Sequence, residues 1–336
     1  MPRVILFILL MLIHLPMGAC ASWNKAAIPV PLAEQVAVGD RYMGIRLLGN
    51  LRLPTIPVNG LTPHGLSGLA WDEDAAILYA LSDKGMLFHL RPYFQGDILH
   101  DVQFVAAYRL QDAEGKPLQA PFADAEGLVI ANDANGVSGD SELWISFEVK
   151  VRVARYSPTG KWLGEQPLPK PNGNPDYYAG SNTALEAIAL HEQWGLLLAP
   201  ERSPQGWRSG KVPIFTLDGK HWTYPLYSAP KSSLVAMEAL ADNSLLTLER
   251  AFVSLLQPLY IVLRRTFLPE DRHLKLTVKE VAVFATSQGW LLDNFEGLTQ
   301  HRNRRFFMIS DDNSRALQST LLVYFELLPL QSNFAP

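Results

Sequence analysis

The sequence predicts an all-β fold, a β-propeller whose blades close into a ring, and three observations support this prediction. A short segment recurs five times along the chain. Each copy is followed by a turn and by a second apolar strand that ends in charged residues. A helical pattern sustained over several turns is hard to find. Strands and turns that repeat at a long period are typical of propellers, in which each repeat forms one blade.

The recurring segment starts with an acid or a serine, which is followed by a small residue and then by an aliphatic residue. The copies begin at positions 67, 126, 186, 238 and 296, so they are 59, 60, 52 and 58 residues apart. The five copies are Ser67-Gly68-Leu69, Glu126-Gly127-Leu128, Glu186-Ala187-Ile188, Glu238-Ala239-Leu240 and Glu296-Gly297-Leu298. They predict five blades, and a degenerate sixth blade is left open.

Further strand-like runs complete the units to about four strands each, the usual size of a propeller blade. The last unit has only one further run, 321–328, and the run 42–53 precedes the first unit without a partner of its own. Pairing these two runs in one blade closes the ring and removes two exposed sheet edges. A β-sandwich made of the same hairpins is the alternative, and the regular spacing favours the propeller.

The composition is that of one large folded domain. The chain has 336 residues, of which 48% are hydrophobic and 18% are charged. Such a composition supports a sizeable core and does not indicate disorder. The formal net charge is -4, so no basic field argues for a nucleic-acid partner. We therefore expect a single propeller domain over residues 41–330, a monomer whose partner is a small molecule.

The N-terminal residues have the pattern of an export signal. Arg3 precedes an apolar run at 4–15 that is too short to span a membrane. The next residues, Met17-Gly18-Ala19-Cys20, resemble a bacterial lipobox, and Cys20 is the only cysteine in the chain. This pattern predicts a signal peptide over residues 1–19 and a lipid on Cys20, with residues 20–40 as a tether.

The lipidated protein is expected in the periplasm or at the outer membrane, where it contacts a membrane only through its lipid anchor. The alternative is cleavage within Ala19-Cys20-Ala21, a small-residue site that releases a soluble exported protein. A lone cysteine has no partner in the same chain, so the fold must be stable without disulfides.

Charged residues are expected to gather at one mouth of the central channel. The start of the first strand of an antiparallel hairpin lies beside the end of the second strand, and the first strands of a propeller line its channel. The acids that open the repeats are candidate catalytic residues: Glu126, Glu186, Glu238 and Glu296. The acids that end the second strands are candidate metal ligands: Asp83, Glu148, Glu201, Glu249 and Asp311. Three cations among them are candidate substrate-binding residues: Lys84, Arg202 and Arg250.

Carboxylates at such close spacing raise one another's pKa unless a proton, an ion pair or a hard cation offsets their charge. Ca²⁺ takes about six to eight oxygen ligands in a flexible geometry, which suits a ring of carboxylates. A divalent cation, with Ca²⁺ favoured by this ligand set, is therefore the expected cofactor. The alternative is that Glu201-Arg202 and Glu249-Arg250 only tie neighbouring blades together through ion pairs.

Several segments, taken together, are more specific for one protein family than any of them is alone. They are Ser67-Gly68-Leu69-Ala70-Trp71, Leu81-Ser82-Asp83, Glu126-Gly127-Leu128, Glu186-Ala187-Ile188, Leu248-Glu249-Arg250, Asn294-Phe295-Glu296-Gly297-Leu298 and Ser310-Asp311-Asp312-Asn313. This set resembles the phytase-like domain family over about residues 42–328. The resemblance implies a β-propeller with esterase-like activity in an exported, hydrolase-like protein. The calcium-rich signature of the true β-propeller phytases is not present in the sequence.

Two functions are compatible with these observations. The first is a metal-assisted hydrolase that acts on an ester or a phosphoester at the channel mouth. A bound cation would polarise the scissile group and activate water, Arg202 and Arg250 would hold an anionic part of the substrate, and one of the four glutamates would be the general base. The second is a non-catalytic propeller that binds a ligand or a protein partner at the cell envelope. An open cleft with unpaired carboxylates favours the first function, whereas complete Glu–Arg pairing favours the second.

Overall fold

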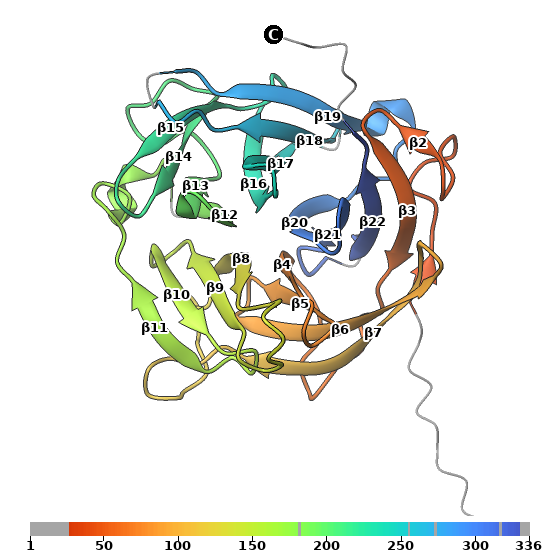
Figure 1. Cartoon of the computed structure of the whole chain (residues 1–336), viewed down its shortest axis with the longest axis horizontal. Coiled ribbons are helices and arrows are strands. Elements are labelled where there is room, and N and C mark those ends of the chain that lie inside the picture. The colour runs from red at the N-terminus through yellow and green to blue at the C-terminus, as the bar shows by residue number, and fades with distance from the viewer. Residues whose placement is uncertain (1–26, 181–182, 255, 272–273, 316–317, 330–336) are drawn as a thin grey trace, which may run out of the picture.

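The computed structural model describes residues 27–180, 183–254, 256–271, 274–315 and 318–329. Five antiparallel sheets stand around a central axis (Figure 1), so the predicted β-propeller with five blades is confirmed. The predicted signal peptide over residues 1–19 and the predicted lipidation site Cys20 lie outside the described residues. Within the described ranges, no helix is both long enough and apolar enough to cross a membrane.

Four blades are built from consecutive strands, and their first strands contact one another around the axis. In order from the axis outwards, these strands are β4 (Leu66–Asp72), β5 (Ile77–Ser82), β6 (Met86–Gln95) and β7 (Ile98–Arg109), then β8 (Ala125–Ala131), β9 (Glu142–Phe147), β10 (Arg152–Tyr156) and β11 (Trp162–Gln166), then β12 (Leu185–His191), β13 (Gly195–Pro200), β14 (Lys211–Thr216) and β15 (His221–Pro225), and then β16 (Ser232–Ala239), β17 (Ser244–Ala251), β18 (Tyr260–Phe267) and β19 (Thr277–Ala285). Two short 3-10 helices, η1 (Pro175–Tyr177) and η2 (Thr286–Gln288), lie in the connections.

The fifth blade joins the two ends of the domain, as the sequence predicts. It contains β20 (Asn294–Gln300), β21 (Arg305–Asp311) and β22 (Leu321–Leu327), and its outer strand is β3 (Ile45–Arg52). Strands β22 and β3 are antiparallel, with Leu321 opposite Arg52 and Leu327 opposite Ile45. The ring is therefore closed by backbone hydrogen bonds between residues far apart in the sequence, and two sheet edges are removed.

The predicted tether is wrong for residues 27–40, because this segment packs on the propeller. Strand β1 (Ile28–Pro29) pairs with β3, and β2 (Arg41–Tyr42) pairs with β3 as well. Leu32 and Ala33 are each 2% exposed. The backbone N–H of Leu291 donates to the carbonyl of Leu32 at 2.8 Å. Leu32, Ala33 and Val36 of this segment are buried in the core, whereas Ile28 and Val38 stay exposed.

The strands near the axis are apolar on both faces because each blade packs between two neighbours. Every residue of β5 is buried, and β13 is buried after its first residue. A sheet covered on both faces gives continuous apolar runs in place of alternation, which is the pattern that these strands have in the sequence.

The small residue of the repeat allows adjacent first strands to approach closely. A Cβ added to Gly68 would lie 2.8 Å from the Cβ of Leu128, and one added to Gly127 would collide with the carbonyl oxygen of Glu186. In each blade the pairing of first and second strands shifts at the residue before the small residue, which forms a β-bulge; in β8 the irregularity also includes the small residue Gly127. A bulge leaves one residue unpaired and redirects its side chain, which here is the acid that opens the repeat in three of the blades.

Candidate functional site

The bulges define equivalent positions in the five blades, and these positions form two rings at one mouth of the channel. The bulge positions are Ser67, Glu126, Glu186, Val235 and Glu296. The second-strand positions that follow the opposing pair are Asp83, Glu148, Glu201, Arg250 and Asp311. Seven of the ten positions carry a carboxyl group and one, Arg250, carries a guanidinium group. We call this set the acidic mouth.

Glu238 is not part of the acidic mouth, so the prediction that four glutamates converge there is wrong for this residue. The bulge in β16 lies between Leu234 and Ala236, which makes Val235 the equivalent of the other three glutamates. Glu238 lies three residues farther along β16 and lines a cavity at the other end of the channel. Glu238-Ala239-Leu240 matches the repeat in sequence, whereas Val235-Ala236-Met237 is the structural equivalent of the repeat in this blade.

The prediction that Glu249 binds a metal at the mouth is also wrong, because this residue lies elsewhere. Its carboxylate is fully buried between two blades, where it accepts hydrogen bonds from the Tyr224 hydroxyl at 2.6 Å and from the Tyr227 backbone N–H at 2.6 Å. Arg264 Nη1 lies 2.7 Å from Glu249 Oε1. These partners account for both oxygens of Glu249, so this residue is structural.

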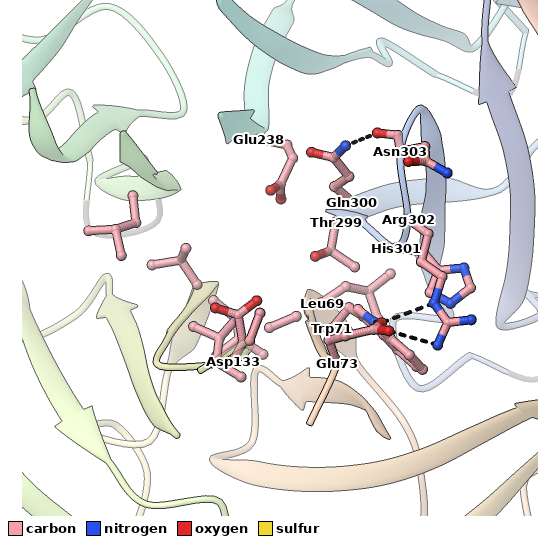
Figure 2. Close-up of a pocket in the computed structure, with 16 residues that line it drawn as sticks. Leu69, Trp71, Glu73, Asp133, Glu238, Thr299, Gln300, His301, Arg302 and Asn303 are labelled. Carbon is pink, nitrogen blue, oxygen red and sulfur yellow. Dashed lines mark hydrogen bonds and ion pairs between the residues drawn. The ribbon is translucent and has the colours of Figure 1, made fainter. Parts of the chain in front are cut away.

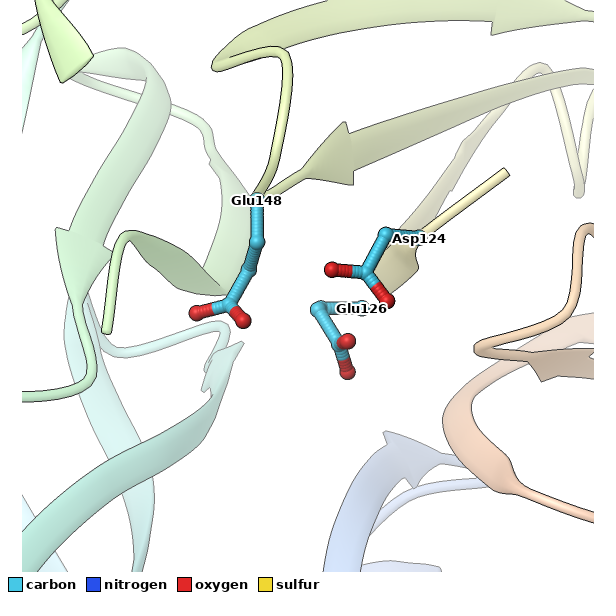
Figure 3. A group of neighbouring side chains, drawn as sticks. All are labelled: Asp124, Glu126 and Glu148. Atoms are coloured by element: carbon cyan, nitrogen blue, oxygen red, sulfur yellow. The ribbon is translucent and has the colours of Figure 1, made fainter. Parts of the chain in front are cut away.

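Three other carboxyl groups form a cluster that can hold a metal ion (Figure 3). Each of Asp124, Glu126 and Glu148 offers an oxygen, and the three oxygens lie within 4.8 Å of one another. The Glu148 residue is 1% exposed. Its Oε1 accepts the backbone N–H of Ala184 at 2.8 Å, whereas its Oε2 is buried without a hydrogen-bond partner in the described structure. An unsatisfied buried carboxylate oxygen is unfavourable, and a cation bound in this cluster would satisfy it.

The electrostatics of the cluster favour either protons or a cation. Burial raises the pKa of Glu126 well above its usual range, and the nearby charges of Glu186 and Glu148 raise it further. Burial raises the pKa of Glu148 to about 8, with Glu201 and Asp124 contributing. The pKa of Asp124 is raised by burial and by Asp83. A divalent cation would reverse these shifts, because it stabilises the ionised carboxylates.

Arg250 neutralises another part of the mouth. It contacts Asn294 Oδ1 and Glu296 Oε1 through Nη1, and its Nη2 lies 3.2 Å from Glu201 Oε1. Burial raises the pKa of Glu296 to about 7; Arg250 opposes this rise, and the charges of Asp311 and Glu201 add to it. Arg202 Nη2 lies 3.3 Å from Glu201 Oε1, and the Arg202 side chain is 43% exposed. The predicted substrate-binding residue Arg250 is therefore engaged by carboxylates, while Arg202 stays accessible.

The remaining predicted residues lie in the first and last blades, at and just after the ends of β5 and β21. Lys84 Nζ is 2.6 Å from Asp83 Oδ2, and the Lys84 side chain is 58% exposed. Burial raises the pKa of Asp83, which Lys84 counteracts. Burial raises the pKa of Asp311 to about 6, although the carboxylate accepts the Asn313 backbone N–H at 2.7 Å. The first blade is thus linked to the cluster of Asp124, Glu126 and Glu148 through the charges of Asp83 and Asp124.

Sequence reasoning missed Asp124 and the pair formed by His64 and Asp312. Asp124 lies two positions before Glu126, and side chains two apart in an extended chain share a face, so this spacing was the available signal. His64 Nδ1 is 2.7 Å from Asp312 Oδ2, and Asp312 Oδ1 accepts the Gly65 backbone N–H at 3.0 Å. No local pattern connects these two residues, which are 248 positions apart.

An apolar constriction closes the channel below the acidic mouth. It is formed by one buried residue from each first strand: Leu69, Leu128, Ile188, Met237 and Leu298. The free space that the surrounding residues enclose at the axis is about 10 Å³, which is no more than the room needed by one water molecule. The two ends of the channel are therefore separate compartments.

Fold and site together define a class: a β-propeller with a ring of carboxyl groups at one channel mouth, three of which can hold a metal ion. The model of the phytase-like family, described as "Esterase-like activity of phytase", matches residues 62–314. The chain belongs to this family, as the sequence resemblance indicates.

Among solved structures, the chain is similar to a gluconolactonase of Xanthomonas campestris. The identity is 12% and the TM-score 0.41, over 89% of this chain and 97% of that chain. It is also similar to the Dos1 propeller, with 8% identity and a TM-score of 0.36 over 78% of this chain and 67% of that chain. The comparison with curated proteins gives no significant match.

Proposed function

We propose that the protein is a hydrolase that uses a divalent cation at the acidic mouth to cleave an ester or a phosphoester. The observation that carries this proposal is the cluster of Asp124, Glu126 and Glu148, with its unsatisfied buried oxygen on Glu148. The description of the family as esterase-like supports the same reaction class. The all-oxygen ligand set favours Ca²⁺ over softer metals.

A divalent cation held by these carboxylates supplies Lewis-acid chemistry and lowers the pKa of water. Glu186 is our candidate general base, because it is a bulge position of the acidic mouth and is not one of the three residues of the cluster. Burial and the charges of Glu201 and Glu148 raise its pKa well above the usual range, so it takes up a proton more readily than an ordinary glutamate. The exposed ends of Arg202 and Lys84 can hold an anionic part of the substrate.

The test is a panel of carboxylic esters and phosphoesters, assayed with the calcium-loaded wild-type protein and with Glu148→Gln. The Gln side chain keeps the size and removes the charge, so we expect hydrolysis and bound metal to fall by about tenfold or more while circular dichroism stays unchanged. Glu114→Gln changes an exposed acid outside the mouth and is the matched control. Full activity in Glu148→Gln, or no hydrolysis by the wild-type protein, contradicts the proposal.

A second candidate is a non-catalytic propeller that binds a ligand or a protein at the cell envelope. The observation that favours it is the engagement of Arg250 by both Glu201 and Glu296, because paired charges stabilise a scaffold and are not available for substrate. Metal binding without hydrolysis of any compound in the panel supports this candidate.

For the location, we propose export and membrane anchoring through a lipid on Cys20. The apolar run and the lipobox-like residues before Cys20 support this proposal. Replacing Cys20 with Ser should move the protein from the membrane fraction to the soluble fraction. Unchanged membrane association of that variant rules out the anchor.

A further inference from the structure

A cavity lies at the end of the channel opposite to the acidic mouth (Figure 2). Its volume is about 470 Å³, which is within the range of about 300–1,000 Å³ that is usual for small-molecule sites. Its walls include the apolar side chains of Leu69, Leu128, Ile130 and Leu190. The apolar constriction separates it from the acidic mouth, so a ligand here would be independent of the proposed hydrolase site.

The charges that line this cavity are unbalanced. Glu238 from β16 and Asp133 from the loop after β8 both project toward its centre in Figure 2. The cation in the lining, Arg302, is already paired, because its Nη2 lies 2.8 Å from Glu73 Oε1 and its Nε donates to Glu73 Oε2 at 3.0 Å. Burial and the charge of Arg302 lower the pKa of His301 to about 4, so His301 is neutral at pH 7. The described lining thus leaves two carboxyl groups without a cationic partner.

We propose that this cavity is a second ligand site, which binds a small organic ammonium ion with an apolar body. The two carboxyl groups provide the negative end, and the aliphatic walls provide a surface for the body of the ligand. A charged group in an apolar site is stable only when it is paired, and an ammonium group supplies the missing charge and up to three hydrogen-bond donors.

Other occupants fit the lining less well. A neutral alcohol or sugar supplies no positive charge, so it cannot stabilise the ionised forms of Glu238 and Asp133. Ca²⁺ needs about six to eight oxygen ligands, and the described residues form no group of three acidic or histidine ligands at this end of the channel. An organic ion uses both the acids and the apolar walls.

Proton linkage gives the proposal a distinctive signature. Burial raises the pKa of Glu238 to about 8, and the charge of Asp133 adds to this, while hydrogen bonds from the Gln300 backbone and the Thr299 side chain lower it. Asp133 itself has a pKa raised by burial. The other charged groups of the cavity, Glu73 and Arg302, neutralise each other. An ammonium ion favours the ionised form of Glu238, so its binding at pH 7 should release a proton.

The experiment is calorimetric titration of the whole protein with cyclohexylammonium chloride, beside cyclohexanol as a neutral probe of similar shape. We expect the alcohol to bind about tenfold or more weakly, the loss typical of a missing charge-assisted hydrogen bond. Repeating the titration in two buffers of different ionisation enthalpy should show proton release. Glu238→Gln and Asp133→Asn should each weaken binding of the amine, whereas Glu114→Gln should not. A chelator should leave binding unchanged.

Equal binding of the alcohol and the amine overturns the proposal, and so does the absence of amine binding. Binding that survives in both Glu238→Gln and Asp133→Asn also overturns it, because the ion would then sit elsewhere. Circular dichroism of both variants checks that each one folds, and the loop position of Asp133 makes its variant a second test that does not alter a strand near the axis.

Discussion

At the scale of single residues, Arg250 determines how the charges of the acidic mouth are shared. It occupies the position that carries an acid in the other four blades, and it contacts Glu201, Asn294 and Glu296. The glutamates near Arg250 are therefore partly neutralised, whereas Glu126 and Glu148 on the far side are left to protons or to a metal. Because one blade has Arg250 where the others have an acid, the acids near Arg250 form ion pairs, and Glu126 and Glu148 have no cationic partner in the described structure.

Replacing Arg250 with Ala should destabilise the protein, because Glu201 and Glu296 lose their cationic partner while they stay buried. Removing one partner of a buried ion pair typically costs about 3–5 kcal/mol of unfolding free energy. Arg91→Ala, at an exposed position of β6, is the control and should change stability by less than about 0.5 kcal/mol. Urea unfolding of both variants measures the difference, and equal losses would show that the pairing of Arg250 contributes nothing.

At the scale of elements, the β-bulge and the small residue after it explain why the repeat has the sequence that it has. The bulge aims the acid at the channel mouth, and the small residue lets the next first strand approach. From this pattern, sequence analysis correctly predicts that the acids of β8, β12 and β20 lie at the channel mouth. The prediction fails in β16, because the bulge position there is Val235, an uncharged residue. The sequence motif with the acid, which starts at Glu238, comes three residues later.

The packing of residues 27–40 gives a prediction that reverses the one made from the sequence. Leu32 is buried in the same core as Trp290, so Leu32→Ala should cost about 2–5 kcal/mol, the usual range for a buried Leu→Ala change. Leu256→Ala, at a side chain that is 96% exposed, is the control. A melting temperature that is the same for both variants would show that the segment is a tether after all.

At the scale of the whole molecule, the closure of the ring and the blade count can be predicted from the spacing of the repeats. The contacts between side chains of different blades cannot be predicted from this spacing. The predicted pairing of β3 with β22 is confirmed. It could be predicted because unpaired sheet edges are unfavourable. The partner of His64 and the cavity around Glu238 depend on how separate blades and loops meet in space. Such contacts leave no periodic signal in one sequence.

Stability should depend on pH through the buried acids. The pKa values of Glu148 and Glu238 are raised to about 8, that of Glu296 to about 7 and that of Asp311 to about 6. An acid whose pKa is higher in the folded state binds more protons there than in the unfolded chain, so its contribution is lost as the pH rises through the folded value. The unfolding free energy of the metal-free protein should therefore fall between about pH 5 and pH 8.

Saturating Ca²⁺ should reduce this fall, because the cation stabilises the ionised forms of Glu126 and Glu148. Urea unfolding at several pH values, with chelator and with Ca²⁺, measures both effects. A free energy of unfolding that rises with pH across this window in the metal-free protein is incompatible with the raised pKa values.

The central claim is that the acidic mouth binds a divalent cation through Asp124, Glu126 and Glu148. Anomalous diffraction from crystals soaked in a calcium-mimicking lanthanide locates such an ion directly. The predicted result is a peak about 2.3–2.6 Å from oxygens of all three residues, and no peak at this place in crystals of Glu148→Gln. Wild-type crystals with an empty mouth, or with the ion only in the cavity around Glu238, would contradict the claim.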